Sequence, residues 1–553
     1  MRKKLFFILI LAVVTGKESA AQIFRKASFS RADTLRGTYT AERSWWDVTH
    51  YAISVKPDLA TERISGNNII TYRVLRPEQR MQIDLQMPME IDSIIQEGRH
   101  VRFEREGNAF FVNLDKKQVA GKLEKITIFY SGAPKKALNA PWNGGWVWKK
   151  DDQGNPWVTV ACQGLGASVW YPNKDHQSDE PDSASMTITV PDDLVAVANG
   201  RLRWKKNDKE RKLATYCWAV TNPINNYNLI PYIGKYTRWT ETFQGEKGAL
   251  GCTYWVLEPH LEKSKEHFKQ VKQMMKCFEH WFGPYPFYED GYQLVEAPHL
   301  GMEHQSAIAY GNAYKNGYMG SDLSGSGWGM KFDFIIIHET GHEWFGNNIT
   351  TKDVADMWVH EGFTSYSEAL FAECQYGIEA ANAYVQGIRK NISNSSPVIG
   401  QYNVNNEGSG DMYFKGSNLV HIIRQVMNND EKFRNMLRDM NKVYYHQTVT
   451  SAEIEAFISK YSGFDFSKVF DQYLRTVKIP ELDHKTETVN EKLILSYRWT
   501  NCVEGFNMPM RIQVAPGEWK FIYPTTEWQS VETGFTPDQF KWEEIKDKNF
   551  YIK

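Results

Sequence analysis

Residues 337–347 of the chain have the sequence Ile337-His338-Glu339-Thr340-Gly341-His342-Glu343-Trp344-Phe345-Gly346-Asn347. The four residues before His338, from Phe334 to Ile337, are all apolar, which indicates a buried helix rather than a solvated one. Because residues four apart lie one above the other on a helix, His338 and His342 can offer two imidazoles to one metal ion. Two buried histidines also need polar partners, and a metal ion would be one. The sequence therefore predicts a metal-binding helix.

A candidate third ligand follows this helix. We expect the helix to end at residues 346–348 and a second one to begin near Asp353 and run past Glu361. The eighteen residues between His342 and Glu361 allow a helix end, a turn and a return to the metal. Two histidines and one carboxylate leave a fourth position open, which is typical of a catalytic zinc site, with one Zn²⁺ per chain. Glu368, seven residues after Glu361, either orients a zinc ligand or is an ordinary surface acid.

The run from Ile337 to Phe363 resembles the zinc site of the aminopeptidase N family, the gluzincin aminopeptidases with H-E-x-x-H, eighteen residues and a glutamate. Three further motifs of that family occur in the expected order. They are Cys162-Gln163-Gly164, which resembles the strand that helps to hold the substrate amine, Leu300-Gly301-Met302-Glu303-His304, which resembles G-x-M-E-N, and Tyr413-Phe414-Lys415-Gly416, which resembles Y-x-K-G. The resemblance covers most of residues 46–480.

The resemblance implies a role for each of four residues. Glu339, directly after the first histidine, would be the general base that takes a proton from the attacking water. Tyr413 would donate a hydrogen bond to the oxyanion, although its sequence context alone also fits a packing aromatic residue. Glu303 and Gln163 would bind the free amine of a peptide substrate, because an N-blocked substrate would leave the carboxylate buried and unpaired.

The substrate loop departs from the family pattern at two positions, and the third-ligand motif departs at one. Gly301 and Met302 are expected to place backbone groups along the substrate, again by resemblance. Leu300 replaces the first glycine of the exopeptidase motif, His304 replaces its asparagine, and His360 replaces the asparagine before Glu361. These changes leave the predicted metal ligands intact and alter the first substrate pocket.

Composition agrees with a globular chain of several domains. The 553 residues are 42% hydrophobic and 24% charged, and the net charge of −1 does not suggest a nucleic-acid partner. A mean hydropathy of −0.52 excludes a polytopic membrane protein. Six cysteines are too few for a disulfide scaffold, and none has zinc-knuckle spacing. Cys277 and Cys374 fall in helical stretches, where we expect small buried residues with one bridge at most.

The pattern along the chain changes from strands to helices and back to strands. Strand patterns occur at residues 51–55, 69–72 and 186–190 and return at 493–497, 510–514 and 521–523, helical spacing begins at 261–282, and a capping box occupies 450–453. We therefore expect a multidomain α+β protein with the following parts: a signal peptide (1–21), a loose lead-in (22–45), an all-β, saddle-like N-terminal domain (46–240), a thermolysin-like, mostly α catalytic domain (241–482) and a small β-sandwich-like C-terminal domain (483–553).

The first residues predict export. Arg2, Lys3 and Lys4 precede ten apolar residues, Leu5 to Val14, and small residues end at Ala21. Ten apolar residues fall short of the roughly 20 that span a bilayer, so a cleaved signal peptide is expected rather than an anchor. The mature protein would then be periplasmic or secreted.

Three functions fit these features. The main one is an exported zinc aminopeptidase acting on peptides with a free N-terminal amine. The second is an epoxide-hydrolase-like enzyme of the leukotriene hydrolase branch, which carries a helical C-terminal domain where this chain has strand patterns. The third is a zinc protein of the cell envelope that binds peptides with little or no turnover. Without a helical C-terminal domain to cover it, the site would be open to solvent or covered by a partner chain, for example in a dimer.

Overall fold

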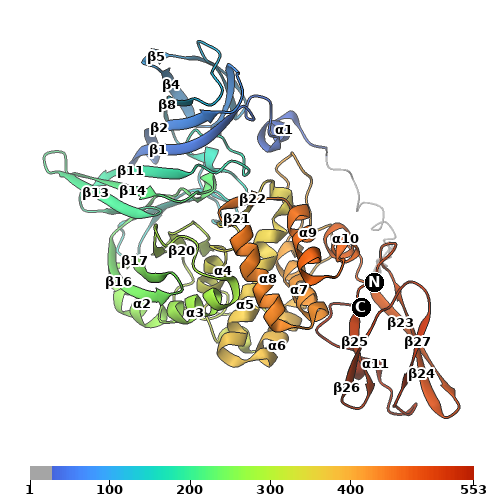
Figure 1. Cartoon of the computed structure of the whole chain (residues 1–553). Coiled ribbons are helices and arrows are strands. Elements are labelled where there is room, and N and C mark those ends of the chain that lie inside the picture. Colours follow the sequence, from blue (N-terminus) through green and yellow to red (C-terminus); the bar gives the residue numbers. More distant parts are fainter. Residues whose placement is uncertain (1–27) are drawn as a thin grey trace, which may run out of the picture.

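The computed structural model describes residues 28–553 (Figure 1). The predicted signal peptide, residues 1–21, and the beginning of the predicted lead-in lie outside the described residues. The described chain forms a region of β-sheets, then a mostly helical region, then a smaller β region, so the predicted multidomain α+β fold class is confirmed. Within residues 28–553, no helix is both long enough and apolar enough to cross a membrane.

The N-terminal region is built on an eight-stranded sheet with strand order β13-β14-β11-β1-β2-β8-β4-β5. Buried and partly buried residues alternate along its central strands, as expected for a sheet packed on one face. The predicted strands at 51–55, 69–72 and 186–190 fall in β1, β2 and β11. The eight strands are β1 (Trp46–Asp58), β2 (Arg63–Val74), β4 (Glu90–Gln96), β5 (Arg99–His100), β8 (Leu123–Gly132), β11 (Ser183–Pro191), β13 (Arg201–Asp208) and β14 (Leu213–Val220).

Two smaller sheets complete the N-terminal region. One has the order β3-β7-β6 and the other the order β12-β15-β10-β9. Their strands are β3 (Arg80–Asp84), β6 (Arg102–Glu106), β7 (Ala109–Asn113), β9 (Gly145–Lys150), β10 (Pro156–Ala161), β12 (Val195–Val197) and β15 (Tyr232–Gly234). The loop that follows β10 carries Gln163, so this sheet delivers one of the predicted substrate residues.

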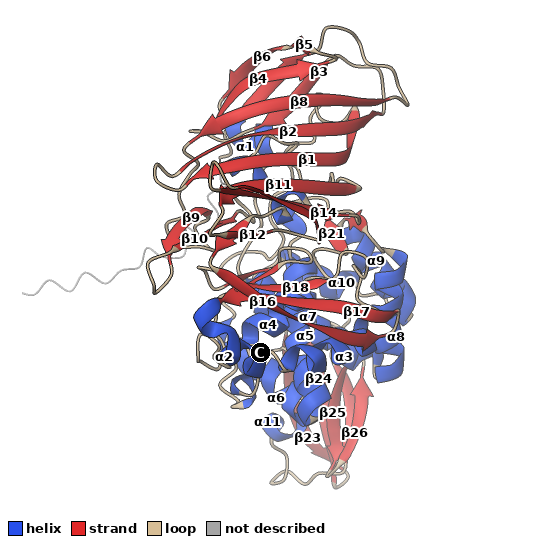
Figure 2. Ribbon diagram, turned by 90° about the vertical axis from the view of Figure 1, so that its left-hand side faces the viewer, coloured by secondary structure: helices blue, strands red, loops and turns tan. Residues whose placement is uncertain are grey.

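The middle region combines a mixed sheet, with strand order β16-β17-β18-β20-β19, and a group of helices. In Figure 2 this sheet lies between the N-terminal sheets and the helices. Its strands are β16 (Tyr236–Gly245), β17 (Gly248–Leu257), β18 (Tyr292–Glu296), β19 (Gly301–Met302) and β20 (Ile308–Tyr310). The predicted boundary at 240/241 falls inside β16. The short strand β19 forms one edge of the sheet and belongs to the predicted exopeptidase motif.

The helices of the middle region match the predicted helical stretch, with one division. The segment 261–282 forms two helices instead of one continuous helix. The capping box at Thr450 and Glu453 is confirmed at the start of α9. The helices are α2 (Leu261–His267), α3 (Gln270–Phe282), α4 (Phe334–Gly341), α5 (Trp358–Tyr376), α6 (Ile378–Ile388), α7 (Asp411–Met427), α8 (Asp430–Val443), α9 (Ser451–Ser462) and α10 (Ser467–Arg475), with the strands β21 (Ile349–Thr351) and β22 (Gln447–Val449) between them.

The C-terminal region consists of two small sheets, β23-β24-β27 and β25-β26. Its elements are β23 (Glu481–Val489), β24 (Lys492–Thr500), β25 (Met510–Ala515), β26 (Glu518–Ile522), β27 (Gln529–Thr533) and the short helix α11 (Trp542–Ile545). Buried residues of this region, including Trp499 and Met510, belong to the same apolar core as Phe470 of α10. Figure 1 shows that these sheets lie beside α7 and α10, so they pack against the side of the helical region.

The described part of the predicted lead-in is ordered, which differs from the expected loose segment. Arg31–Gly37 forms helix α1, and the side chains of Ser30 and Asp33 cap each other's backbone N–H groups. Leu35 is buried against Ala109 and Phe111 of β7. The prediction failed because α1 has little apolar periodicity, and its order comes from polar contacts with the rest of the molecule.

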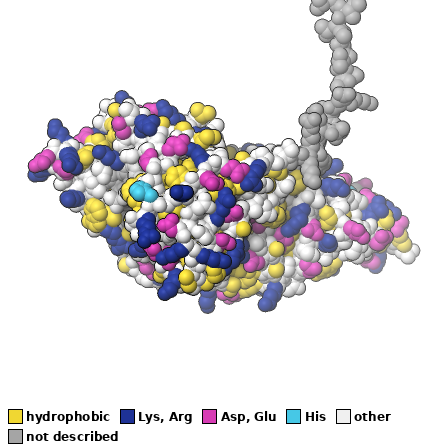
Figure 3. All heavy atoms as spheres, turned by 90° about the horizontal axis from the view of Figure 1, so that it is seen from above, with side chains coloured by type: hydrophobic (Ala, Val, Ile, Leu, Met, Phe, Trp, Pro, Cys, Tyr) yellow, Lys and Arg dark blue, Asp and Glu magenta, His cyan; other side chains and the backbone are white. Residues whose placement is uncertain are grey.

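Two further features concern covalent links and surface charge. Cys277 of α3 and Cys374 of α5 form a disulfide, which the expectation of at most one bridge allowed. Cys277 is buried as expected, whereas Cys374 lies at the surface, so the expectation of burial is wrong for Cys374. Cys162, Cys217, Cys252 and Cys502 are unpaired within the described chain. On the face seen in Figure 3, Lys and Arg side chains are interspersed with Asp and Glu.

Candidate active site

Helix α4 carries the first predicted metal ligand and the predicted general base. Its N-terminus is capped by Asp333, whose carboxylate accepts hydrogen bonds from the backbone of Ile335 and Ile336. The apolar side chains before His338 are buried, as predicted. The helix ends at Gly341, earlier than the predicted 346–348, but His342 keeps helical backbone angles of φ −62° and ψ −20°. His342 therefore still lies one turn after His338.

Helix α5 returns the third predicted ligand to the two histidines. The Nε2 atoms of His338 and His342 lie 3.5 Å and 3.3 Å from Oε2 of Glu361. All three side chains are buried, and their ligand atoms lie within 4.8 Å of one another. Oε2 of Glu361 has no hydrogen-bond partner among the described residues, although it is buried. A buried carboxylate oxygen facing two imidazole nitrogens is the donor set that Zn²⁺ accepts.

The other ring nitrogen of each histidine is held by a hydrogen bond. Nδ1 of His338 lies 2.8 Å from Oε1 of Glu368, and the Tyr384 hydroxyl donates to the second oxygen of that carboxylate at 2.6 Å. Nδ1 of His342 donates to the carbonyl of Phe345 at 2.9 Å. Both histidines thus keep Nε2 free for a metal ion. Of the two alternatives for Glu368, the structure favours the one in which it orients a ligand.

The carboxylates of the site have different pKa values because their neighbours differ. Burial raises the pKa of Glu339 to about 7; the charges of His338 and His342 oppose this shift, and those of Glu303 and Glu361 add to it. Burial would also raise the pKa of Glu361, but the same two histidines lower it well below its usual value. Glu361 is therefore ionised, as a metal ligand must be, and Glu339 can take up and release a proton near neutral pH.

Gly301 lies directly over the carboxylate of Glu339. A Cβ atom at position 301 would be 2.7 Å from Oε1 of Glu339 and 2.8 Å from a methyl carbon of Ile335, so a larger residue there would displace the Glu339 carboxylate or Ile335. Together with Met302 it forms β19, which pairs with β20 on one side and is the edge of the sheet on the other. An unpaired strand edge beside the metal ligands can accept the extended backbone of a peptide.

The predicted amine-binding residues meet in the same site. The Gln163 amide and the Tyr227 hydroxyl both donate to Oε1 of Glu303, the latter at 2.8 Å. Burial raises the pKa of Glu303, opposed mainly by the charge of His342. Glu303, Glu339 and His342 form a second group whose ligand atoms all lie within 4.8 Å of one another. The carboxylate predicted to bind an amine is therefore a neighbour of the predicted metal site.

Tyr413 reaches the site from the first turn of α7. Its ring centre lies 6.1 Å from that of His338. Burial raises the pKa of its hydroxyl well above the usual value, and Glu361 adds to the shift, so the group stays protonated and can donate a hydrogen bond. Helix α7 approaches α5 very closely at Gly416 and Gly362, where a Cβ on Gly416 would be only 2.9 Å from the Cα of Gly362.

The three departures from the family motifs are accommodated in different ways. His360 is buried and accepts a hydrogen bond from the backbone N–H of Thr351 at 2.8 Å, and burial lowers its pKa to about 3. It therefore ties α5 to β21 as a neutral ring. His304 is buried with Nδ1 beside the hydroxyl of Tyr232, and Leu300 is partly buried against the main core. None of the three contacts a predicted metal ligand through a hydrogen bond in the described structure.

Sequence reasoning missed several residues that the structure places around the site. Tyr384 and Tyr227 lie 16 and 76 positions from Glu368 and Glu303, the carboxylates they contact, and no local sequence pattern connects residues at such separations. Asn347 is the last residue of the metal-binding stretch 337–347, and its side-chain amide donates to the carbonyl of Glu303 at 2.8 Å. Glu407 lies 3.6 Å from the Cβ position of Gly164, next to Gln163, and burial raises its pKa. It adds a carboxylate at the rim of the site.

A buried His-His-Glu group with a second glutamate in position to act as base is the arrangement of zinc metallopeptidases. Residues 266–473 match the family model described as Peptidase family M1 domain. The chain therefore contains a peptidase family M1 domain, and the resemblance to the aminopeptidase N family is confirmed. The catalytic metal of this family is zinc, which the donor set fits.

Within the aligned segments, the named relatives are 20–26% identical to this chain. Leukotriene A-4 hydrolase of Xenopus laevis is 22% identical over 83% of this chain and 76% of its own length. Probable aminopeptidase 2 of Sulfurisphaera tokodaii is 20% identical over 77% of this chain, and the match spans about half of that relative, 54%. Aminopeptidase N of Lactococcus lactis is 26% identical over 38% of this chain and 27% of its own length.

Solved structures with the same fold include an M1 zinc metallopeptidase of Deinococcus radiodurans. One of its structures, a variant bound to a Tyr-Ser-Ala substrate, superposes with a TM-score of 0.65 at 20% identity and covers 78% of this chain and 95% of its own. A second structure of this metallopeptidase superposes with a TM-score of 0.63 at 21% identity, covering 76% of this chain and 91% of its own. At this level of identity the likeness concerns the fold.

Proposed function

We propose that this M1 peptidase is an exported zinc aminopeptidase that removes single residues from the free N-termini of peptides. The observation that carries the proposal is the position of Glu303, whose carboxylate lies within 4.8 Å of the ligand atoms of Glu339 and His342. One residue of extended chain spans about 3.4 Å. A peptide whose ammonium group contacts Glu303 would therefore place its first carbonyl beside the metal ligands.

Each residue of the site has a step to perform in such a reaction. When bound, zinc polarises the carbonyl and lowers the pKa of water to roughly 7. Glu339 takes a proton from the attacking water and delivers it to the leaving amine, for which its pKa of about 7 is suited. The Tyr413 hydroxyl donates a hydrogen bond to the oxyanion, and loss of such a donor typically lowers the rate about 10²–10³-fold.

The buried carboxylate of Glu303 also accounts for selection of a free amine. An ammonium group offsets the burial of its charge, whereas an acetylated terminus leaves that charge unpaired. Removing one partner of a buried ion pair costs about 3–5 kcal/mol, which corresponds to more than a hundredfold in kcat/KM. This is the physical difference between an aminopeptidase and an endopeptidase at this site.

The proposal is tested by loading the purified protein with one zinc per chain and supplying aminoacyl aryl-amides, which also reveal the side-chain preference. Release of the aryl amine supports it, and bound zinc without turnover of any free-amine substrate refutes it. The Glu339→Ala variant should retain zinc and lose turnover. The Glu303→Ala variant should lose activity mainly on free-amine substrates; an equal loss on N-acetylated ones would remove the amine-binding role.

Export is a separate part of the proposal. The disulfide between Cys277 and Cys374 supports it, because such bonds persist in oxidising compartments. The predicted signal sequence supports it as well. Expression of the full chain followed by N-terminal sequencing tests this part. A mature chain that begins at Gln22 outside the cytoplasm is expected, and an uncleaved cytoplasmic chain would contradict it.

An epoxide-hydrolase-like activity is the second candidate, because one relative is named leukotriene A-4 hydrolase. Against it stands the C-terminal region, which in this chain consists of the strands β23 to β27 where that branch is expected to be helical. Hydrolysis of an allylic epoxide by the same preparation distinguishes the two.

A peptide-binding protein without turnover is distinguished by the aryl-amide assay. Measurement of the mass in solution tests whether a partner chain covers the site.

A further inference from the structure

The loop that carries Gln163 is held from outside by the N-terminal segment. This loop, residues 162–166, follows β10 and contains Gly164 and Gly166, both with positive φ angles of +67° and +97°. Its internal hydrogen bonds run from the Leu165 N–H to Gln163 O and from the Gly166 N–H to Cys162 O. Two glycines in such a short loop allow many conformations. External contacts must therefore fix the position of Gln163.

Arg36, near the end of α1, provides an external contact to two carbonyls of this loop, and the Gln86 amide donates to one of them, that of Leu165, at 2.7 Å. Its guanidinium donates to the carbonyl oxygens of Leu165 and, at 3.2 Å, of Gly164. It also lies 3.6 Å from the carboxylate of Asp175. A Cβ atom on Gly166 would be 2.2 Å from both Nη2 of Arg36 and Oδ2 of Asp175, so this glycine makes room for the ion pair. The guanidinium thus holds two successive carbonyls of the substrate loop.

The same segment contacts the middle region on its other side. A Cβ on Gly37 would lie 2.2 Å from the backbone N of Asn405, so α1 ends in close backbone contact with the loop that precedes α7. The Thr38 hydroxyl donates to the carbonyl of Asn403 at 2.9 Å. The Asn405 amide in turn donates to the carbonyl of Gly164 at 3.2 Å. Residues 36–38 therefore lie between the Gln163 loop and the loop that leads to Tyr413.

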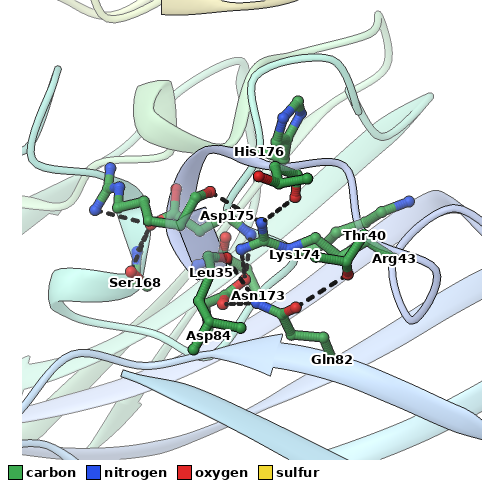
Figure 4. Close-up of polar contacts among 12 residues, drawn as sticks. Leu35, Thr40, Arg43, Gln82, Asp84, Ser168, Asn173, Lys174, Asp175 and His176 are labelled. Carbon is green, nitrogen blue, oxygen red and sulfur yellow. Dashed lines mark hydrogen bonds and ion pairs between the residues drawn. The ribbon is translucent and has the colours of Figure 1, made fainter. Parts of the chain in front are cut away.

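Arg43 fixes the segment itself to the N-terminal β region (Figure 4). It is fully buried and donates to the carbonyls of Arg36 and Thr38, each at 2.9 Å, and to Oδ2 of Asp84 at 2.6 Å. The same Asp84 oxygen accepts the backbone N–H of Asp175 at 3.0 Å. The Gln82 amide reaches the carbonyl of Leu35 at 3.0 Å. These charge-assisted contacts make residues 30–43, here called the N-terminal strap, a rigid support.

We propose that the N-terminal strap positions the substrate-amine site, with Arg36 as a positioning residue that holds Gln163 against Glu303. The inference rests on the proposed aminopeptidase function and deepens it. The chain of contacts runs from Arg36 to the carbonyls of 164 and 165, then to Gln163, and from its amide to Oε1 of Glu303. Without Arg36, Gln163 samples positions from which it reaches neither Glu303 nor an ammonium group.

The expected kinetic signature follows from where Gln163 acts. Gln163 contacts the substrate amine equally in the bound substrate and in the transition state. Loss of this contact therefore weakens the binding of both states by the same amount, which raises KM and leaves kcat nearly unchanged. The Arg36→Ala variant should raise KM about tenfold and change kcat less than about threefold, since one hydrogen bond to a charged group contributes about a factor of ten or more. Arg36→Lys keeps the charge but reaches one carbonyl at a time, and should restore part of the affinity.

A second measurement does not depend on turnover. Hydrogen–deuterium exchange of the backbone amides of Leu165 and Gly166 reports whether the loop stays closed. Exchange there should become faster in Arg36→Ala and stay unchanged in the matched control Arg31→Ala. Arg31 lies on the same helix but pairs with the exposed Glu106, away from the loop. Should Arg36→Ala fail to fold, Asn405→Asp removes the other donor to Gly164 and should give the same two effects.

Faster exchange of the loop together with a raised KM in Arg36→Ala, and neither in Arg31→Ala, supports the proposal. An unchanged KM, or an equal change in Arg31→Ala, overturns it. If the wild-type protein turns over no free-amine substrate, the proposed function fails. The exchange measurement then decides about the strap alone, and unchanged exchange in Arg36→Ala overturns that part.

Discussion

The close approach of α5 and α7 leads to the most specific prediction about catalysis. Glu361 on α5 and Tyr413 on α7 must both face the metal site, and the two helices touch between Gly362 and Gly416. Replacing Gly416 by alanine puts a methyl group where the two backbones meet. We expect this change to move Tyr413 away from its position relative to Glu361 while it leaves the metal ligands in place.

The size of the effect follows from the contact distances. A Cβ atom at position 416 would lie 2.9 Å from the Cα of Gly362, whereas carbon atoms in contact are about 3.5–4.0 Å apart. The helices must separate by roughly 0.6–1 Å. A misplacement of about 1 Å lowers rates up to about 10²-fold, and complete loss of an oxyanion donor about 10²–10³-fold. We therefore expect kcat to fall about 10–100-fold and stability by about 1–3 kcal/mol.

The assay is kcat on an aminoacyl aryl-amide, with zinc content and the free energy of unfolding measured on the same samples. Gly410→Ala is the matched control. Gly410 precedes α7 with an ordinary φ of −61°, and a Cβ there would meet nothing within 4 Å. It should leave kcat unchanged.

A double-mutant cycle locates the effect. In a Tyr413→Phe background, where the oxyanion donor is already absent, Gly416→Ala should lower kcat less than about threefold further. Retention of wild-type kcat by Gly416→Ala would refute the argument. A full additional loss in the Tyr413→Phe background would show that the effect does not pass through Tyr413.

Three other predictions concern the metal, a buried lysine and the disulfide. Glu368→Gln removes the anionic partner of His338 and should weaken zinc binding about 10–100-fold in competition with a chelator; unchanged affinity would contradict the role of Glu368. Burial lowers the pKa of Lys415 to about 8 in the folded protein, below its unfolded value of 10.5, so its contribution to stability is largest above pH 10.5 and is lost as pH falls to 8. The unfolding free energy of the wild type should therefore rise relative to that of Lys415→Met by roughly 2 kcal/mol as pH rises from 8 to 10, and a constant difference between the two would refute this. Replacing both Cys277 and Cys374 by alanine opens a link across 97 residues and should lower the unfolding free energy by about 3–5 kcal/mol, whereas a loss below about 1 kcal/mol would indicate a strained bond.

The metal site was predictable because its ligands obey local geometry. The spacing of His338 and His342 fixes one helix face, and the buried run before them fixes the helix. Glu361 needed one more step, a turn followed by a second helix, which the structure contains as α5. The end of α4 was placed too late because Gly341 ends the regular helix while His342 retains helical angles.

Contacts between distant segments were predictable only through resemblance or not at all. The meeting of Gln163 and Glu303 joins residues 140 positions apart, and no local pattern specifies it. The pairing of Cys277 with Cys374 depends on how α3 packs on α5. The strap was missed because its order comes from Arg36 and Arg43, whose partners are backbone carbonyls and the carboxylates of Asp84 and Asp175, which are distant in sequence.

The central claim is that a zinc ion held by His338, His342 and Glu361 works together with Glu303 to cleave after a free N-terminal residue. The most direct test compares kcat/KM of the zinc-loaded protein for a tripeptide and for the same tripeptide acetylated at its N-terminus. We predict release of the first residue from the free peptide and at least about a hundredfold lower kcat/KM for the acetylated one. Equal cleavage of both peptides, or cleavage of neither with zinc bound, would contradict the claim.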